Sequence, residues 1–142
     1  MKKAIAIIPH VFYSILLVWA VYLFIDLPRG DYGLIVPSLI FVFAPLPSAI
    51  SAVGLMIVNI KTKAENKGIS IAYGVIGSFL LILYAVLFLG VANINFDGIF
   101  YWAYLTAVIV APFCLFAIWV LWIIGAVKSR KCKGGFKYVP KN

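Results

Sequence analysis

Charged residues divide this chain into four long uncharged runs, and this division constrains the fold more than any other feature of the sequence. The runs cover residues 4–25, 32–60, 68–96 and 98–127, which are 22, 29, 29 and 30 residues long. A helix rises 1.5 Å per residue, so about 20 residues cross the roughly 30 Å hydrocarbon core of a bilayer. Each run is long enough for one crossing and too short for two. The sequence therefore predicts four transmembrane segments.

The composition and the residue pattern indicate that these segments are helices. Hydrophobic residues make up 65% of the chain and charged residues 11%, against about 45–50% and about 25% in soluble domains. The strands of a membrane barrel would alternate polar and apolar residues, and residues 15–18 and 79–83 do not alternate. We expect an all-α polytopic integral membrane protein, a bundle of four transmembrane helices in one membrane domain, residues 1–142. The expected spans are about 4–25, 33–60, 69–92 and 99–127, and a basic cytoplasmic tail follows at 128–142.

The basic residues predict the orientation of the bundle. Eleven of the twelve fall on one side of the predicted membrane: Lys2, Lys3, Lys61, Lys63, Lys67, Lys128, Arg130, Lys131, Lys133, Lys137 and Lys141. The positive-inside rule places this side, with both termini, in the cytoplasm. We expect a bacterial cytoplasmic (inner) membrane, with the basic tail against anionic lipid headgroups. The alternative for the first segment is a cleaved signal peptide, which its long apolar run and the bulky Trp19 disfavour.

Small residues recur at a spacing of four within three of the runs, and such stripes let helix backbones approach closely in a membrane. The predicted helix-packing residues are Ala44, Ser48 and Ala52, then Ser70, Gly74 and Ser78, then Ala103, Ala107 and Ala111. We interpret the stripes as contacts inside the bundle, with an exposed oligomer face as the alternative. The first run has no such stripe, and we expect its helix to pack at the periphery.

Aromatic residues gather near the predicted ends of the spans, where amphipathic rings favour the membrane interface. The outer belt is expected to contain Trp19, Tyr22, Tyr32, Tyr101, Trp102 and Tyr104, and the inner belt Tyr73, Trp119 and Trp122.

A candidate polar or kink site combines one histidine, one serine and three prolines. His10 and Ser14 lie one helical turn apart in the first run, while Pro45, Pro47 and Pro112 interrupt the second and fourth runs. Proline removes a backbone donor and bends a helix, and histidine is the only titratable group with charge chemistry expected at depth. The site is either a proton relay or headgroup contact, or a histidine bonded to a carbonyl or water. The second interpretation is the preferred one.

The sequence offers no set of residues for catalysis. None of the four spans contains Asp, Glu, Lys or Arg, which disfavours charge-coupled transport and acid–base chemistry in the bilayer. Small multidrug exporters have a similar length, but their first-helix glutamate has no equivalent here. One histidine and two cysteines make no zinc site. If helical, the 18 residues from Cys114 to Cys132 extend about 27 Å, too far for a disulfide. We expect no catalytic residues, no metal, no other cofactor and no nucleic-acid partner.

These features favour a small non-enzymatic membrane protein that acts through helix–helix contacts in the bilayer. Its expected partners are the lipid bilayer and another membrane protein or a second copy of itself, in the role of an accessory subunit or an immunity-type protein. The alternative is an oligomeric carrier or channel for a lipid or a small solute, built around the prolines of the second and fourth helices.

Overall fold

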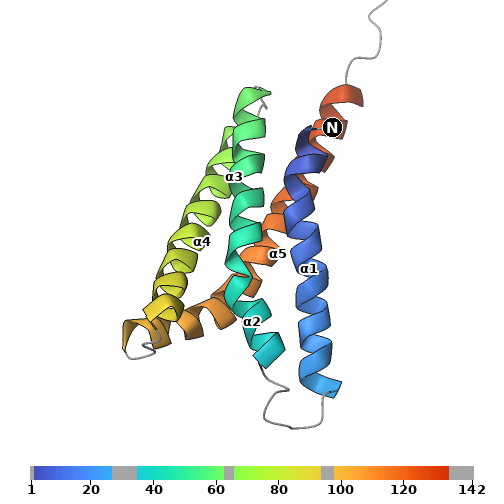
Figure 1. The fold of residues 1–142 in the computed structure, drawn as a ribbon. Helices are drawn as coiled ribbons and strands as arrows, with labels where there is room; N and C mark the ends of the chain where they lie inside the picture. The colour runs from blue at the N-terminus through green and yellow to red at the C-terminus, as the bar shows by residue number, and fades with distance from the viewer. Residues whose placement is uncertain (1, 27–34, 63–65, 94–97, 135–142) are drawn as a thin grey trace, which may run out of the picture.

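The computed structural model describes residues 2–26, 35–62, 66–93 and 98–134, and all regular structure among them is helical. There are five helices in chain order (Figure 1): α1 (Lys2–Asp26), α2 (Ile35–Phe43), α3 (Pro45–Lys61), α4 (Lys67–Asn93) and α5 (Ile99–Gly134). The prediction of an all-helical fold is confirmed for these described residues.

Within the described part of the chain, four helical segments are long and apolar enough to cross a membrane. They are Lys2–Asp26, Ile35–Lys61, Lys67–Ala92 and Ile99–Ser129, each with a mean hydropathy of at least 2.1 in its most apolar window. Their number and order confirm the four predicted segments. Residue 33, the expected start of the second span, lies outside the described residues. The expected tail is described only over residues 128–134, which continue α5, and residues 135–142 lie outside the description.

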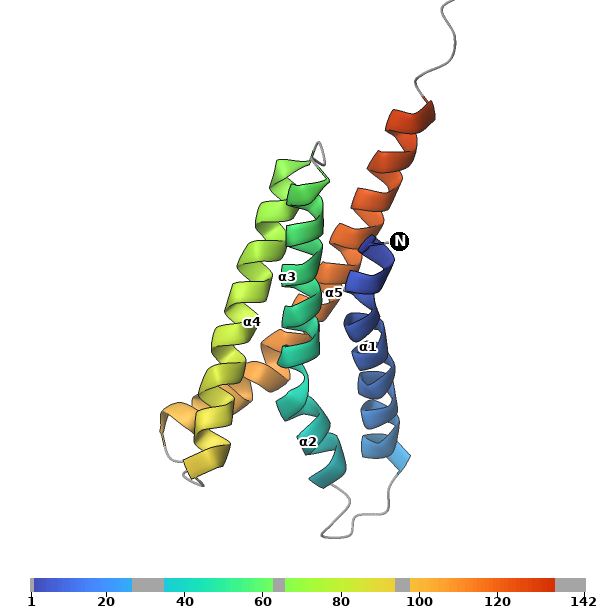
Figure 2. The same cartoon turned by 45° about the horizontal axis from the view of Figure 1, so that its top comes forward.

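Proline shapes two of the four segments. The second segment is divided at Ala44. Pro45 is the first residue of α3, and proline is tolerated in the first turn of a helix. Because Pro45 and Pro47 have no N–H, they cannot bond the carbonyls of Phe41 and Phe43 four residues earlier, and α2 leaves the axis of α3 (Figure 1). Pro112 lies inside α5, which runs obliquely from α4 before turning along the bundle (Figure 2).

Four lysines lie at or near helix ends that meet at one end of the bundle. Lys2 begins α1, Lys61 ends α3, Lys67 begins α4 and Lys128 lies near the end of α5. Figure 2 shows these four helix ends at one end of the bundle, and Asp26 ends α1 at the other. We refer to the first as the basic end.

Helix α3 is the centre of the packing. It contacts α4 most extensively and α1 next, while α5 packs mainly on α4. The main core cluster draws on α1, α3, α4 and α5 and consists of Ile7, Ala49, Ala52, Leu55, Tyr73, Leu80, Ala111 and Ile118. The first helix is expected at the periphery. Helix α1 packs mainly against α3 and α2 and buries Ile7, His10, Tyr13 and Ala20.

Candidate functional site

The small residues of α3 and α5 lie mostly inside the bundle. Ala44, Ser48 and Ala52 are each at most 1% exposed, and Ala107 and Ala111 are also buried. Ala103 is half-buried and packs against the cluster of Leu83, Leu87 and Ala107. Because these side chains are small, the backbones of neighbouring helices can lie close together at this depth.

The three small residues predicted to form the packing stripe on α4 do not all face the interior of the bundle. Ser70 is buried and Gly74 half-buried, but Ser78 is exposed. Steps of four residues turn about 40° around a helix of 3.6 residues per turn, so the stripe rotates away from the contact. The buried line mixes steps of three and four, as in packing at shallow crossing angles, and consists of Ser70, Tyr73, Gly77, Leu80, Leu83, Leu87 and Gly90.

His10 lies in the centre of a polar cluster that joins α1 to α3. Its side chain is 0% exposed. The backbone N–H of His10 donates to Ser51 Oγ at 2.9 Å, and Nδ1 lies 3.3 Å from Ser48 Oγ. Pro9 loosens the helix here, because its ring pushes against the carbonyl of residue 5. The sequence pattern indicated His10 as a site residue but not Ser51. Ser51 could have been found from its position three residues after Ser48, which places the two serines on the same face of a helix.

Ser14 and Trp119 extend the cluster to α5. The hydroxyl of Ser14 donates to the carbonyl of His10 at 2.8 Å and accepts a hydrogen bond from Trp119 Nε1 at 3.1 Å. The rings of His10 and Trp119 lie 5.1 Å apart, centroid to centroid, with an angle of 50° between their planes. One turn of α1 is thereby bonded to both α3 and α5.

The imidazole has one nitrogen without a hydrogen bond. His10 Nε2 is buried and makes no hydrogen bond of good geometry to the described residues, and the backbone of Leu115 interacts with the ring. No acid lies beside the ring to drive proton transfer: Asp26, at the end of α1, is the one described carboxylate. The described residues also contain no group of three metal-ligating side chains. The arrangement holds three helices together.

The prolines lie beside this cluster in the fold. Pro45 is buried, and Pro47 and Pro112 are half-buried. The hydroxyl of Tyr13 donates to the carbonyl of Ile40, one of the last carbonyls of α2 before the break. This bond joins α1 to α2 beside the break.

The aromatic residues of the two expected belts differ in exposure. Trp19, Tyr22, Tyr101 and Trp102 are exposed and Tyr104 is half-buried, while Tyr32 lies outside the described residues. Tyr73, expected in the inner belt, is 2% exposed and belongs to the main core cluster. Trp119 and Trp122 are half-buried and pack edge to face, with ring centroids 5.9 Å apart.

An apolar groove opens where α2 diverges from α4 and α5. Its volume is about 380 Å³, and it is lined by Ile35, Ser38, Leu39, Val42, Phe43, Val91 and Tyr104. Leu39, Phe43 and Val91 are each about half exposed. None of the lining residues is charged. We call this set of residues the outer groove, because it lies toward the end of the bundle opposite the basic end (Figure 1).

Comparison with known proteins adds no name to these features. No family model, no curated protein and no solved structure matches the chain.

Proposed function

We propose that the protein is a non-enzymatic integral membrane protein that acts through helix–helix contacts, as an accessory subunit or an immunity-type protein, with both termini in the cytoplasm of a bacterium. The outer groove carries this proposal. It is an uncharged recess formed by three apolar helices, and the occupant that we assign to it is the side chains along one face of a partner's transmembrane helix.

Hydrogen-bonding chemistry favours a helix over a lipid tail in the outer groove. Pro45 and Pro47 withhold the N–H groups that would bond the carbonyls of Phe41 and Phe43. Of these two residues, Phe43 lines the outer groove. A partner helix with serine or threonine can donate to a free backbone carbonyl, and interhelical bonds of this kind stabilise association in membranes. A lipid tail has no donor. The absence of charge along the groove also fits a contact made within hydrocarbon.

The Leu39→Trp substitution tests the proposal, because a larger ring would fill the outer groove. We expect the tagged wild-type protein, solubilised in a mild detergent, to migrate on a native gel in a complex larger than the 15.7 kDa chain. Overpacking costs about 1–3 kcal/mol, so Leu39→Trp should weaken the complex about tenfold. Ile15→Trp is the matched control, since Ile15 is 64% exposed on α1 and does not line the groove.

Three results would contradict the proposal. The wild-type protein could migrate alone, or both variants could leave its complex unchanged. A complex made only of copies of this chain would also contradict the accessory role and would favour an oligomeric carrier or channel.

A further inference from the structure

A second cavity lies at the basic end, away from the outer groove. Its volume is about 170 Å³, more than five times the roughly 30 Å³ that one molecule occupies in liquid water. All four membrane segments contribute to its wall, which consists of Lys3 from α1, Leu55 and Asn59 from α3, Ile69 and Tyr73 from α4, and Trp122, Gly125, Ala126 and Ser129 from α5. We call it the inner pocket.

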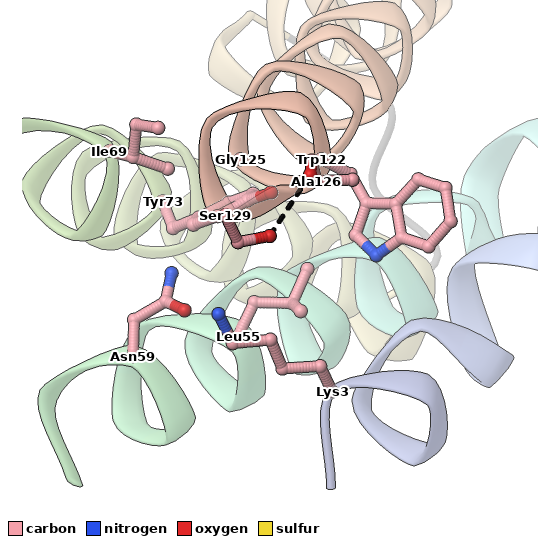
Figure 3. A pocket seen from close by; sticks show the side chains of 9 residues that line it. All are labelled: Lys3, Leu55, Asn59, Ile69, Tyr73, Trp122, Gly125, Ala126 and Ser129. Carbon is pink, nitrogen blue, oxygen red and sulfur yellow. Dashed lines mark hydrogen bonds between the residues drawn. The ribbon is translucent and has the colours of Figure 1, made fainter. Parts of the chain in front are cut away.

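The polar groups of the inner pocket lie at its mouth. Figure 3 shows the side chain of Lys3 reaching from α1 toward Asn59 of α3, with the hydroxyl of Ser129 across the space on α5. Ser129 donates to the carbonyl of Ala126 at 2.9 Å. The ammonium of Lys3, the amide of Asn59 and the phenol of Tyr73 are hydrogen-bond donors that line the pocket.

The charge of the pocket favours an anion. Lys3 is its one charged wall residue, and the one described carboxylate, Asp26, ends α1 at the other end of the bundle. The exposed Lys2, Lys61 and Lys128 add positive charge near the mouth. A phosphate presents several strong acceptor oxygens, and an ammonium donating to an ionised acceptor forms one of the stronger hydrogen bonds in proteins.

The depth and the apolar wall favour a lipid as the source of this phosphate. Lys3, Asn59, Ile69 and Ser129 each lie one or two residues from a lysine that marks the basic end, which places the mouth at the level of lipid headgroups. Below it, Leu55 and Trp122 offer an apolar wall. The wall has no carboxylate to pair with the amine of a zwitterionic headgroup. We propose that the inner pocket binds the phosphate of an anionic phospholipid, with Lys3 as its charged ligand and Asn59 and Tyr73 as neutral donors.

The proposal is independent of the outer groove and is tested by the Lys3→Gln and Lys2→Gln pair. The two variants lose the same charge in the same helical turn, but only Lys3 lines the pocket. Purified protein is titrated with phosphatidylglycerol or phosphatidylcholine of the same chain length, and retained lipid is counted by native mass spectrometry. We expect Lys3→Gln to lower phosphatidylglycerol retention about tenfold and Lys2→Gln to stay within about twofold, since general surface attraction is weak and screened.

Two further variants and a competition with inorganic phosphate keep the result unambiguous. Asn59→Leu removes a donor without changing charge and should also lower retention, whereas Lys3→Arg should preserve it. Gel filtration checks that each variant remains folded. Equal retention of phosphatidylglycerol by Lys3→Gln and Lys2→Gln would overturn the proposal, as would equal retention of the two lipids by the wild type. Release of phosphatidylglycerol by excess inorganic phosphate would show that free phosphate, rather than lipid, is the ligand.

Discussion

The Gly77→Leu substitution is expected to lower the free energy of unfolding by about 3 kcal/mol, because α3 and α4 meet closely at Gly77. A Cβ atom built there would lie 2.9 Å from Val53 Cγ2 and 3.3 Å from both Ala52 Cβ and the backbone nitrogen of Val53. Valine has few accessible rotamers in a helix, so Val53 cannot turn aside. The backbone atom cannot move unless α3 moves with it.

Gly68→Leu is the matched control for this prediction. Gly68 lies in the first turn of the same helix, and a Cβ there would meet no heavy atom within 4 Å. The two substitutions gain similar helix propensity, but only Gly77→Leu has to separate two helices. Unfolding by denaturing detergent, followed by tryptophan fluorescence, measures both. If the two variants lose the same free energy, the close contact of α3 with α4 does not hold the fold.

His10→Ala is expected to have a similarly large effect, a loss of about 3 kcal/mol in the free energy of unfolding. The imidazole is fully buried between Ser48 and Trp119, and removing a buried ring leaves a cavity as well as a lost contact. Phe12→Ala is the control, since Phe12 is 61% exposed on the same helix and should change stability by less than about 0.5 kcal/mol.

His10→Leu separates the volume of the ring from its polarity. Interhelical hydrogen bonds in membranes contribute only about 0.6 kcal/mol on average, and Nε2 has no hydrogen bond to lose. Leucine fills most of the space, so His10→Leu should recover most of the stability that His10→Ala loses. The same unfolding experiment measures the two variants. An equal loss in both would mean that polar contacts of the imidazole, rather than its packing, hold α1 in place.

The number and order of the membrane segments were predictable because a charge inside hydrocarbon is expensive. Charged residues therefore mark the ends of the segments directly, and the uncharged runs coincide closely with α1, the α2–α3 pair, α4 and α5. From Pro45 and Pro47 the sequence predicted a kink in the second segment, but not its division into α2 and α3 at Ala44. The size of the bend depends on how α2 packs against α1 and α5, and local sequence rules do not describe that packing.

The packing was less predictable, because a lipid-facing residue and a buried residue are both apolar in a membrane protein. Ser78 was therefore predicted to pack inside the bundle together with Ser70, but Ser70 is buried and Ser78 is exposed. The buried Gly77 was not predicted as a packing residue. The pairing of Ser14 with Trp119 joins residues 105 positions apart, and sequence spacing gives no sign of it. The same holds for the inner pocket, whose wall residues come from all four segments.

Photocrosslinking from the two walls of the outer groove tests the central claim most directly, that this protein acts by holding a partner helix. A benzophenone amino acid is placed at Leu39 on α2, at Val91 on α4 or, as a control, at Ile15 on α1, and the cells are irradiated. Leu39 and Val91 line the same groove from different helices, so both should form an adduct with the same membrane protein, and Ile15 should not. Adducts with lipid alone, or with different proteins from the two walls, would contradict the claim.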